Sequence, residues 1–171
     1  MKKWLQVVKN YVKILLQLSQ VEVKSLFIGE YSHNIDAKGR MIIPSKFRKD
    51  ELGEIFYVTK GTDKCLFVFS RDEWAKFEEN LSNIPITTNP KAAAFVRFFL
   101  SGAVECEVDK LGRINLPQYL REYAGLEKDV KVLGVRSRIE IWDTKTWSEY
   151  CDKEITLENV IDSMGSIGMD F

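Results

Sequence analysis

The chain has few of the residues that metal sites and disulfide frameworks require. It contains three cysteines and one histidine in 171 residues. Cys65, Cys106 and Cys151 form no CxxC pair and their number is odd, so neither a disulfide framework nor a structural zinc site is expected. Besides the single His33, the sequence has no nucleophile and base at a recognisable spacing and no phosphate-cradling glycine loop. We therefore expect no cofactor, no metal and no enzymatic activity.

The chain also lacks net charge, because 25 lysines and arginines balance 25 aspartates and glutamates. Any binding to nucleic acid must then come from a local cluster of positive charge. Long apolar runs are missing as well, since none approaches the ~20 residues of a membrane span. We expect a globular protein without a membrane partner, in which 171 residues bury one sizeable core or two small cores that share an interface.

A shift of 73 residues aligns one half of the chain with the other. It places IDAKGRMIIPSKFR on VDKLGRINLPQYLR without a gap. The identical pairs include Asp36 and Asp109, Gly39 and Gly112, Arg40 and Arg113, Pro44 and Pro117, Arg48 and Arg121, Gly61 and Gly134, and Trp74 and Trp147. Identity at turn, glycine, proline and tryptophan positions predicts two copies of one backbone.

Each copy predicts the same order of elements. The alternating AVECEVD is typical of a half-buried strand, and DAKG and DKLG suit a type I turn closed by a glycine with positive φ. A short strand follows, then a short helix with Pro44 or Pro117 at its first position. FYVTKGTDKCLFVF and VKVLGVRSRIEIW indicate a second hairpin in each copy. Ser70 with Glu73 predicts a capping box, and Asp143 a matching helix cap.

These elements divide the chain into hairpin domains at residues 30–72 and 103–145. Residues 73–102 are expected to form connecting helices, with a helix that starts at Asn89 and Pro90. Residues 146–171 are expected to form a C-terminal helix and a tail, and weak periodicity after residue 155 predicts little order there. His33 falls on the inner face of its strand and is expected in the core.

At DAKGR, DKLGR and the connector RFFLSGA, the chain resembles the MraZ family, whose members carry two tandem SpoVT/AbrB-like domains. The DxxxR signature occurs twice, from Asp36 to Arg40 and from Asp109 to Arg113. The resemblance implies an α+β fold of two pseudo-symmetric swapped-hairpin β-domains with short helices, packed as one unit. It further implies a cytoplasmic, nucleoid-associated transcriptional regulator that binds short direct repeats of double-stranded DNA upstream of its own operon, the division and cell-wall cluster. Family members also assemble into ring-like homo-oligomers.

The residues of the two motifs suit this function. A hairpin tip is narrow enough to approach a groove, and the planar fork of arginine can bond guanine O6 and N7 together. Residues 36–49 carry a net charge of +4 and residues 109–122 a net charge of +1, so the first copy should dominate phosphate contact. The DNA-binding candidates are Arg40, Lys38, Arg113, Lys110, Lys46 and Arg48. The residues expected to brace the turns are Asp36, Gly39, Asp109 and Gly112.

Each assignment has an alternative. Arg40 could simply pair with Asp36 as a hairpin staple, and Lys46, Arg48 and Lys49 could form an ordinary solvated helix face. For the whole protein, the alternatives are an enzyme on a small barrel, which the residues disfavour, and an oligomeric protein-binding module, antitoxin-like or structural, without direct DNA readout.

Residues 1–25 are expected to be a non-native N-terminal extension, with translation beginning at Leu26. The family that the chain resembles starts with methionine directly before the phenylalanine matched by Phe27, and a bacterial TTG start codon would be written as leucine. Val21, Glu22 and Val23 can also be encoded by a purine-rich ribosome-binding sequence. The alternative is an amphipathic helix that docks on a partner or on a membrane surface, because apolar residues recur there at helical spacing.

Overall fold

The computed structural model describes residues 27–49 and 54–167. The expected extension at residues 1–25 lies outside this part of the chain. The strands are β1 (Phe27–Asn34), β2 (Arg40–Ile42), β3 (Ile55–Lys60), β4 (Leu66–Ser70), β5 (Val104–Glu107), β6 (Arg113–Asn115), β7 (Asp129–Arg136) and β8 (Arg138–Asp143). The helices are η1 (Ser45–Phe47), α2 (Arg71–Ser82), α3 (Pro90–Leu100), α4 (Gln118–Tyr123), α5 (Thr144–Glu154) and α6 (Leu157–Ile167).

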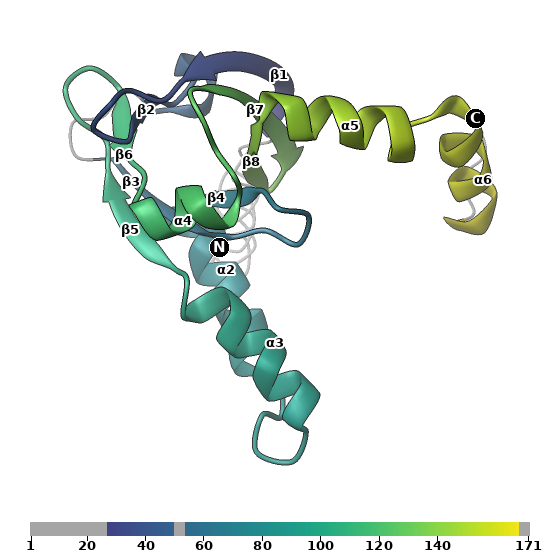
Figure 1. Cartoon of the computed structure of the whole chain (residues 1–171). Coiled ribbons are helices and arrows are strands. Elements are labelled where there is room, and N and C mark those ends of the chain that lie inside the picture. Colours follow the sequence, from purple (N-terminus) through teal and green to yellow (C-terminus); the bar gives the residue numbers. More distant parts are fainter. Residues whose placement is uncertain (1–26, 50–53, 168–171) are drawn as a thin grey trace, which may run out of the picture.

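Strands of the two copies are intermixed within one antiparallel sheet. Its order is β1-β7-β8-β4-β3-β5, so β1 of the first copy pairs with β7 of the second, and β5 of the second pairs with β3 of the first. The remaining strands, β2 and β6, form a separate two-stranded sheet. Each copy therefore lends strands to the other, and neither could pair all of its backbone alone (Figure 1).

The repeat found in the sequence is confirmed. The shift of 73 residues carries β2 onto β6 at both ends, and the first residue of α2 onto that of α5. The mixed α+β class with short helices around antiparallel strands is confirmed as well.

Two clusters of buried side chains hold this arrangement together. The first fills the space between β2, β6 and the large sheet, where Met41, Ile43 and Ile114 are completely buried. The second is largely aromatic and lies under α2 and α3. In it, Trp74 of α2 stacks on Tyr57 of β3 with ring centroids 5.2 Å apart. The first cluster fixes the ribbon of β2 and β6 on the body of the protein.

Helix starts agree with the sequence in part. Ser70 and Asp143 cap α2 and α5 with side-chain oxygens, and Asn89 caps α3. The expected capping box is incomplete among the described contacts, because the carboxylate of Glu73 bonds Lys76 at 2.8 Å. The two prolines stand one position earlier than expected, since Pro44 and Pro117 are the N-cap residues of η1 and α4.

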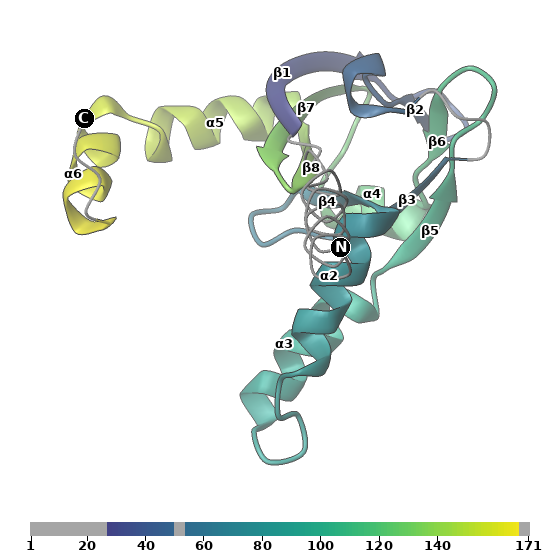
Figure 2. The same cartoon turned by 180° about the vertical axis from the view of Figure 1, so that it is seen from behind.

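The C-terminal prediction was wrong in one respect, because residues 157–167 form helix α6. No residue of α6 is buried, although the apolar residues Leu157, Val160 and Ile161 recur along it at helical spacing. The pair α2 and α3 and the pair α5 and α6 project from the body as two arms (Figures 1 and 2). His33 is only half-buried, so the expectation of a core residue holds in part.

The three cysteines are free, and burial raises the pKa of the Cys65 thiol to about 12. Within residues 27–49 and 54–167, no group of histidine, cysteine and acidic side chains is arranged to hold a metal ion. In the same part of the chain, no helix is both long enough and apolar enough to cross a bilayer.

Candidate nucleic-acid interface

The two-stranded ribbon of β2 and β6 brings the two DxxxR motifs together. The strands are antiparallel, with Arg40 opposite Asn115, Met41 opposite Ile114, and Ile42 opposite Arg113. The reverse turns that precede the strands therefore lie at opposite ends of the ribbon. The ribbon has an approximate two-fold axis through its central pair, Met41 and Ile114.

Alternation along the strands decides which side chains face outward. Met41 and Ile114 are completely buried, so their neighbours on each strand point to the other face. That outer face carries Arg40 and Ile42 from β2, and Arg113 and Asn115 from β6. Arg40 and Arg113 are diagonal neighbours on it, and such neighbours lie about 7–8 Å apart between Cα atoms.

Asp36 performs two tasks at the first turn. Its Oδ1 accepts the backbone N–H groups of Lys38 and Arg40, both at 2.9 Å, which closes the turn. Its Oδ2 accepts Nε–H of Arg40 at 2.8 Å and lies 2.7 Å from Nη2 of that residue. These bonds to Arg40 hold the pKa of Asp36 at about 2, so its carboxylate is charged at neutral pH.

The second turn repeats this network. Oδ1 of Asp109 accepts the backbone N–H groups of Leu111 and Arg113, and Oδ2 takes Nε–H of Arg113 at 2.8 Å. Nη2 of Arg113 lies 2.7 Å from the same oxygen, and the pKa of Asp109 is again lowered to about 2. Both aspartates brace the turn, as the sequence predicts, and both also orient the arginine.

The pairing with aspartate leaves most of each guanidinium free for a ligand. Arginine has five N–H donors, and the aspartate takes Nε–H and one N–H of Nη2. The two N–H groups of Nη1 and the other N–H of Nη2 remain, and the described residues offer them no acceptor. The side chain of Arg40 is 33% exposed and that of Arg113 is 23% exposed. Each arginine is therefore held at one edge and open at the other.

Glycine is required in both turns for two reasons. Gly39 and Gly112 have φ of +79° and +75°, which L side chains rarely adopt. A Cβ on Gly39 would also stand 3.1 Å from Nε of Arg121, and a Cβ on Gly112 would stand 2.7 Å from the guanidinium carbon of Arg48. Arg121 of the second copy thus packs over the turn of the first copy, and Arg48 of the first copy packs over the turn of the second.

This exchange also locates Arg48, one of the DNA-binding candidates. Its Nε–H donates to the carbonyl of Ile43 at 3.0 Å, just as Nε–H of Arg121 donates to the carbonyl of Leu116 at 3.1 Å. These two arginines clamp the ribbon, and this contact accounts for their presence in both copies. A contact between Arg48 and DNA stays a prediction.

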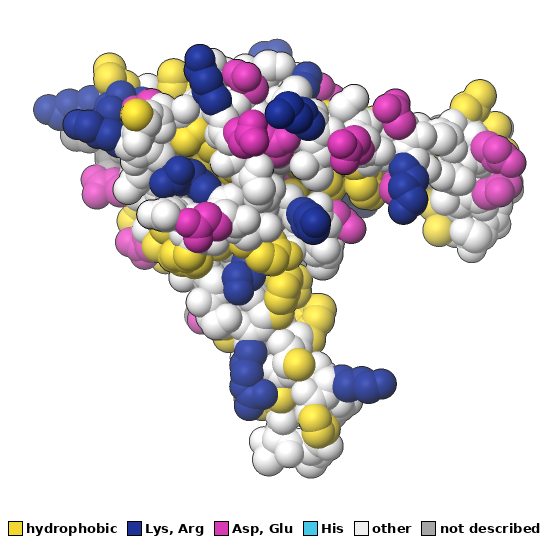
Figure 3. All heavy atoms as spheres, in the orientation of Figure 1, with side chains coloured by type: hydrophobic (Ala, Val, Ile, Leu, Met, Phe, Trp, Pro, Cys, Tyr) yellow, Lys and Arg dark blue, Asp and Glu magenta, His cyan; other side chains and the backbone are white. Residues whose placement is uncertain are grey.

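The remaining candidates surround the ribbon. Lys38 and Lys110 lie in the two turns, Lys46 lies in η1, and all three are exposed. Lys49 is partly engaged, since its Nζ lies 3.6 Å from Asp72. Figure 3 shows lysine and arginine side chains gathered over the end of the molecule that carries β2 and β6. The neutral chain therefore places a basic patch beside the ribbon.

Sequence reasoning missed two residues of the outer face. Ile42 is 43% exposed, and Asn115 is exposed with no hydrogen bond from its side chain among the described residues. The spacing of Arg40 and Ile42, two apart on one strand, was a usable signal. The pairing of β2 with β6 was not readable from the sequence, because it joins residues 71 to 75 positions apart.

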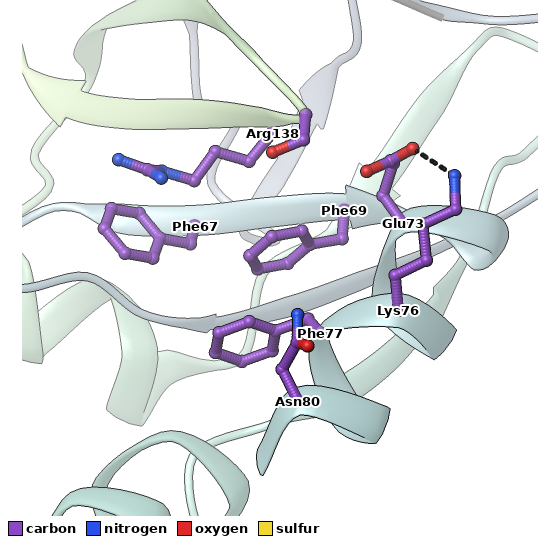
Figure 4. A pocket seen from close by; sticks show the side chains of 8 residues that line it. Phe67, Phe69, Glu73, Lys76, Phe77, Asn80 and Arg138 are labelled. Carbon is purple, nitrogen blue, oxygen red and sulfur yellow. Dashed lines mark hydrogen bonds and ion pairs between the residues drawn. The ribbon is translucent and has the colours of Figure 1, made fainter. Parts of the chain in front are cut away.

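Away from the ribbon, a hollow lies between α2, β4 and the turn from β7 to β8. This hollow has a volume of about 150 Å³ and is walled by Phe67, Phe69 and Phe77 (Figure 4). Its charged groups are already paired, Lys76 with Glu73 at 2.8 Å and Arg138 with Glu140 at 2.7 Å. The guanidinium of Arg138 also lies over the ring of Phe67, 4.2 Å from its centroid. The arrangement resembles a packed surface more than a site for catalysis.

A family model described as "MraZ protein, putative antitoxin-like" matches the chain twice, at residues 26–98 and 99–164. The chain is also similar to proteins named transcriptional regulator MraZ. The one from Acetivibrio thermocellus is 52% identical over 145 residues, which covers 84% of this chain and all of the relative. The one from Halothermothrix orenii is 51% identical over 145 residues with the same coverage. The one from Carboxydothermus hydrogenoformans is 56% identical over 127 residues, covering 74% of this chain and 87% of the relative.

Proposed function

Because the chain belongs to the MraZ family, we propose that it is a transcriptional regulator that reads double-stranded DNA with the outer face of the β2 and β6 ribbon. The relatives named above are transcriptional regulators by name, and enzymatic activity is not expected of such a protein. Its target would be chromosomal DNA, so we expect a cytoplasmic, nucleoid-associated protein.

The observation that carries the proposal is the placement of Arg40 and Arg113 on one outward face. The major groove of B-DNA admits a two-stranded β-ribbon, and the arginine fork matches guanine O6 and N7 there. The two residues are diagonal neighbours about 7–8 Å apart, close to two base-pair steps of ~3.4 Å each. Each arginine can thus address its own base pair within one groove.

The bonds to Asp36 and Asp109 support this reading. A free arginine side chain loses rotamer entropy when it binds, whereas these two are already held in place before DNA arrives. Lys38, Lys46 and Lys110 stand beside them to neutralise phosphates. The ribbon would supply sequence readout, and the surrounding lysines would supply most of the affinity.

We propose further that several subunits act together on short direct repeats upstream of the protein's own operon, the division and cell-wall cluster. One ribbon contacts few base pairs, so useful affinity needs neighbouring subunits that engage spaced repeats. The two arms expose apolar side chains suited to contacts between subunits. These exposed residues are Ile86, Phe95 and Leu100 on the α2 and α3 arm, and Leu157, Val160 and Ile161 on the α5 and α6 arm. A contact between two different surfaces of neighbouring copies would build a ring.

A mobility-shift titration at two salt concentrations tests the proposal, with DNA from upstream of the gene and a scrambled duplex of equal length. We expect preference for the upstream DNA and steep weakening of both complexes with salt. Equal binding to both duplexes would contradict sequence readout. Light scattering gives the oligomeric state, and a monomer that binds one repeat as tightly as several would contradict the role of assembly.

The exposed apolar arms also favour a second candidate, an oligomeric module that binds another protein and does not read DNA. Such a contact would weaken little with salt, whereas phosphate contacts weaken steeply. Failure to bind any duplex at low salt, together with an oligomer of normal size, would favour this candidate.

A further inference from the structure

The outer face of the ribbon departs from its own two-fold symmetry at one pair of positions. The symmetry that exchanges Arg40 with Arg113 also exchanges Ile42 with Asn115. The backbone follows it closely, since Ile43 N–H donates to the carbonyl of Gly112 at 3.0 Å. The bond from Leu116 N–H to the carbonyl of Gly39 repeats it at 2.8 Å. The two halves of the ribbon thus share geometry and differ in the side chain beside each arginine.

Both of these side chains are available to a ligand. Asn115 is exposed, and the described residues provide no hydrogen-bond partner for its amide. Ile42 is 43% exposed although both of its strand neighbours, Met41 and Ile43, are completely buried. Each lies directly across the ribbon from an arginine, Asn115 from Arg40 and Ile42 from Arg113. A duplex that the arginines contact would therefore meet these two residues as well.

The side chains of Asn115 and Ile42 prefer different bases. An asparagine amide donates to N7 and accepts from N6 of adenine in the major groove, which makes adenine its usual base. An isoleucine offers no hydrogen bond, but its methyl groups can pack on the C5-methyl group of thymine. The half of the ribbon with Asn115 and the half with Ile42 would therefore favour different bases.

We infer that Asn115 and Ile42 are specificity-determining residues, and that each ribbon recognises an asymmetric DNA element. Asn115 selects adenine near the guanine held by Arg40, and Ile42 selects thymine near the guanine held by Arg113. This inference rests on the proposed function and extends it, because an asymmetric element has a direction. Such elements suit direct repeats, in which every subunit meets its site in the same orientation, better than inverted repeats.

Selection from a pool of randomised duplex DNA tests this inference with the full chain and three variants. The wild type should select an asymmetric motif. Asn115→Ile makes the two halves alike and should select a motif equal to its own reverse complement, without the adenine. Ile42→Asn also makes the halves alike and should select a symmetric motif with adenine on both sides. The double exchange, Ile42→Asn with Asn115→Ile, restores the asymmetry and should select an asymmetric motif again.

The size of the effect is set by single base contacts. We expect each selected base to be enriched about fivefold or more over its alternatives, and that enrichment to disappear when its reader is exchanged. Binding to a scrambled duplex at low salt should stay within about twofold of the wild type in all variants, which shows that the ribbon remains folded and basic.

Two different outcomes separate the inference from the function on which it rests. A wild type that selects a motif, with single variants that select the same motif, would overturn the role of Asn115 and Ile42 and leave the proposed function intact. A wild type that binds every duplex equally would overturn both. Loss of low-salt binding in the single variants, with normal behaviour of the double exchange, would assign the two residues a structural role and would also overturn the inference.

Discussion

The two copies of the repeat have the same turn, the same arginine and the same aspartate, but they differ in the charge around them. Residues 36–49 carry a net charge of +4, whereas residues 109–122 carry +1. The difference arises largely at two aligned pairs, where Lys46 and Lys49 of the first copy correspond to Tyr119 and Glu122 of the second. Tyr119 instead donates to the carbonyl of Gly102 at 3.2 Å.

This comparison separates two properties of the ribbon, the orientation of its arginines and the charge around them. The hydrogen bonds that orient the arginine occur in both copies with nearly equal lengths, so the geometry around Arg40 is duplicated around Arg113. The lysines that can neutralise phosphate are concentrated in one copy. Under the proposed function, we expect both halves of the ribbon to contribute to sequence readout and the first copy to contribute most of the attraction to the backbone of DNA.

The largest effect is expected from Arg40→Ala. Loss of one bidentate base contact is worth ~1–3 kcal/mol, or roughly 5-fold to 150-fold in affinity, and the loss multiplies over subunits bound to several repeats. Specific binding should therefore disappear, with no change in circular dichroism, because the side chain of Arg40 lies on the outer face of β2 and contributes to neither buried cluster. Arg40→Lys is the matched control and should also lose specificity, since lysine lacks the planar fork. Unchanged affinity for upstream DNA in folded Arg40→Ala would remove the central assignment.

A smaller effect of the same kind is expected from Arg113→Ala. The residue has the same aspartate contacts as Arg40, but fewer cations surround it to hold the DNA close. The expected loss for one subunit is about fivefold, near the lower end of a base contact. Fluorescence anisotropy with DNA that carries one repeat measures it. A loss greater than that of Arg40→Ala would reverse the ranking of the two copies.

The next largest effect on DNA affinity is expected from Lys46→Ala, which removes a positive charge and no base contact. Lys46→Ala should weaken binding to upstream and scrambled DNA equally, and it should reduce the slope of log affinity against log salt by about 1 per subunit. Tyr119→Ala alters the aligned position of the second copy and should leave that slope unchanged. If Lys46→Ala weakened only the upstream complex, this lysine would be a base reader and not a phosphate contact.

The smallest effect is expected from pH, through the ionisation of Asp36 and Asp109 in the two turns. The pKa values of Asp36 and Asp109 are lowered from 3.8 to about 2 by their bonds to Arg40 and Arg113. Because the pKa is lowered in the folded protein, the stability that these pairs contribute is fully present above pH 3.8 and is lost as the pH falls through about 2. DNA binding should therefore show no step from these groups between pH 5 and pH 8. Carboxyl resonances that titrate near 4 in NMR spectra would show that the pairs are open in solution.

Much of the fold was predictable from local signals. The repeated DxxGR turns and the helix caps at Ser70, Asn89 and Asp143 depend on residues close in sequence, and the repeat is visible when the chain is aligned with itself at a shift of 73 residues. The structure agrees with these predictions. The start of the short helices was misplaced by one residue at Pro44, because a proline fits both the cap and the first turn. Helix α6 was missed although Leu157, Val160 and Ile161 recur in it at helical spacing, and these apolar residues are exposed in the structure.

The sequence predicted the residues of the candidate site within each strand, but it did not predict how the two strands pair. The arginines and aspartates could be found from their motif, but the pairing of β2 with β6 joins the two copies and leaves no local trace. Without that pairing, Ile42 and Asn115 look like an ordinary core residue and an ordinary turn residue. Arg48 differs from these two residues, because the sequence pointed to it. Its charge suggested contact with DNA, and the structure shows that its Nε–H also donates to the carbonyl of Ile43.

The most direct test of the central claim is an affinity measurement with modified upstream DNA in which 7-deazaguanine replaces guanine. This base lacks the N7 acceptor but pairs normally, so it removes half of each bidentate contact in the major groove. Wild-type protein should bind the modified duplex at least about fivefold more weakly than the unmodified one, and a variant with both Arg40→Ala and Arg113→Ala should bind the two equally. Equal affinity of the wild type for both duplexes, or the same loss in the double variant, would contradict readout of guanine by the ribbon.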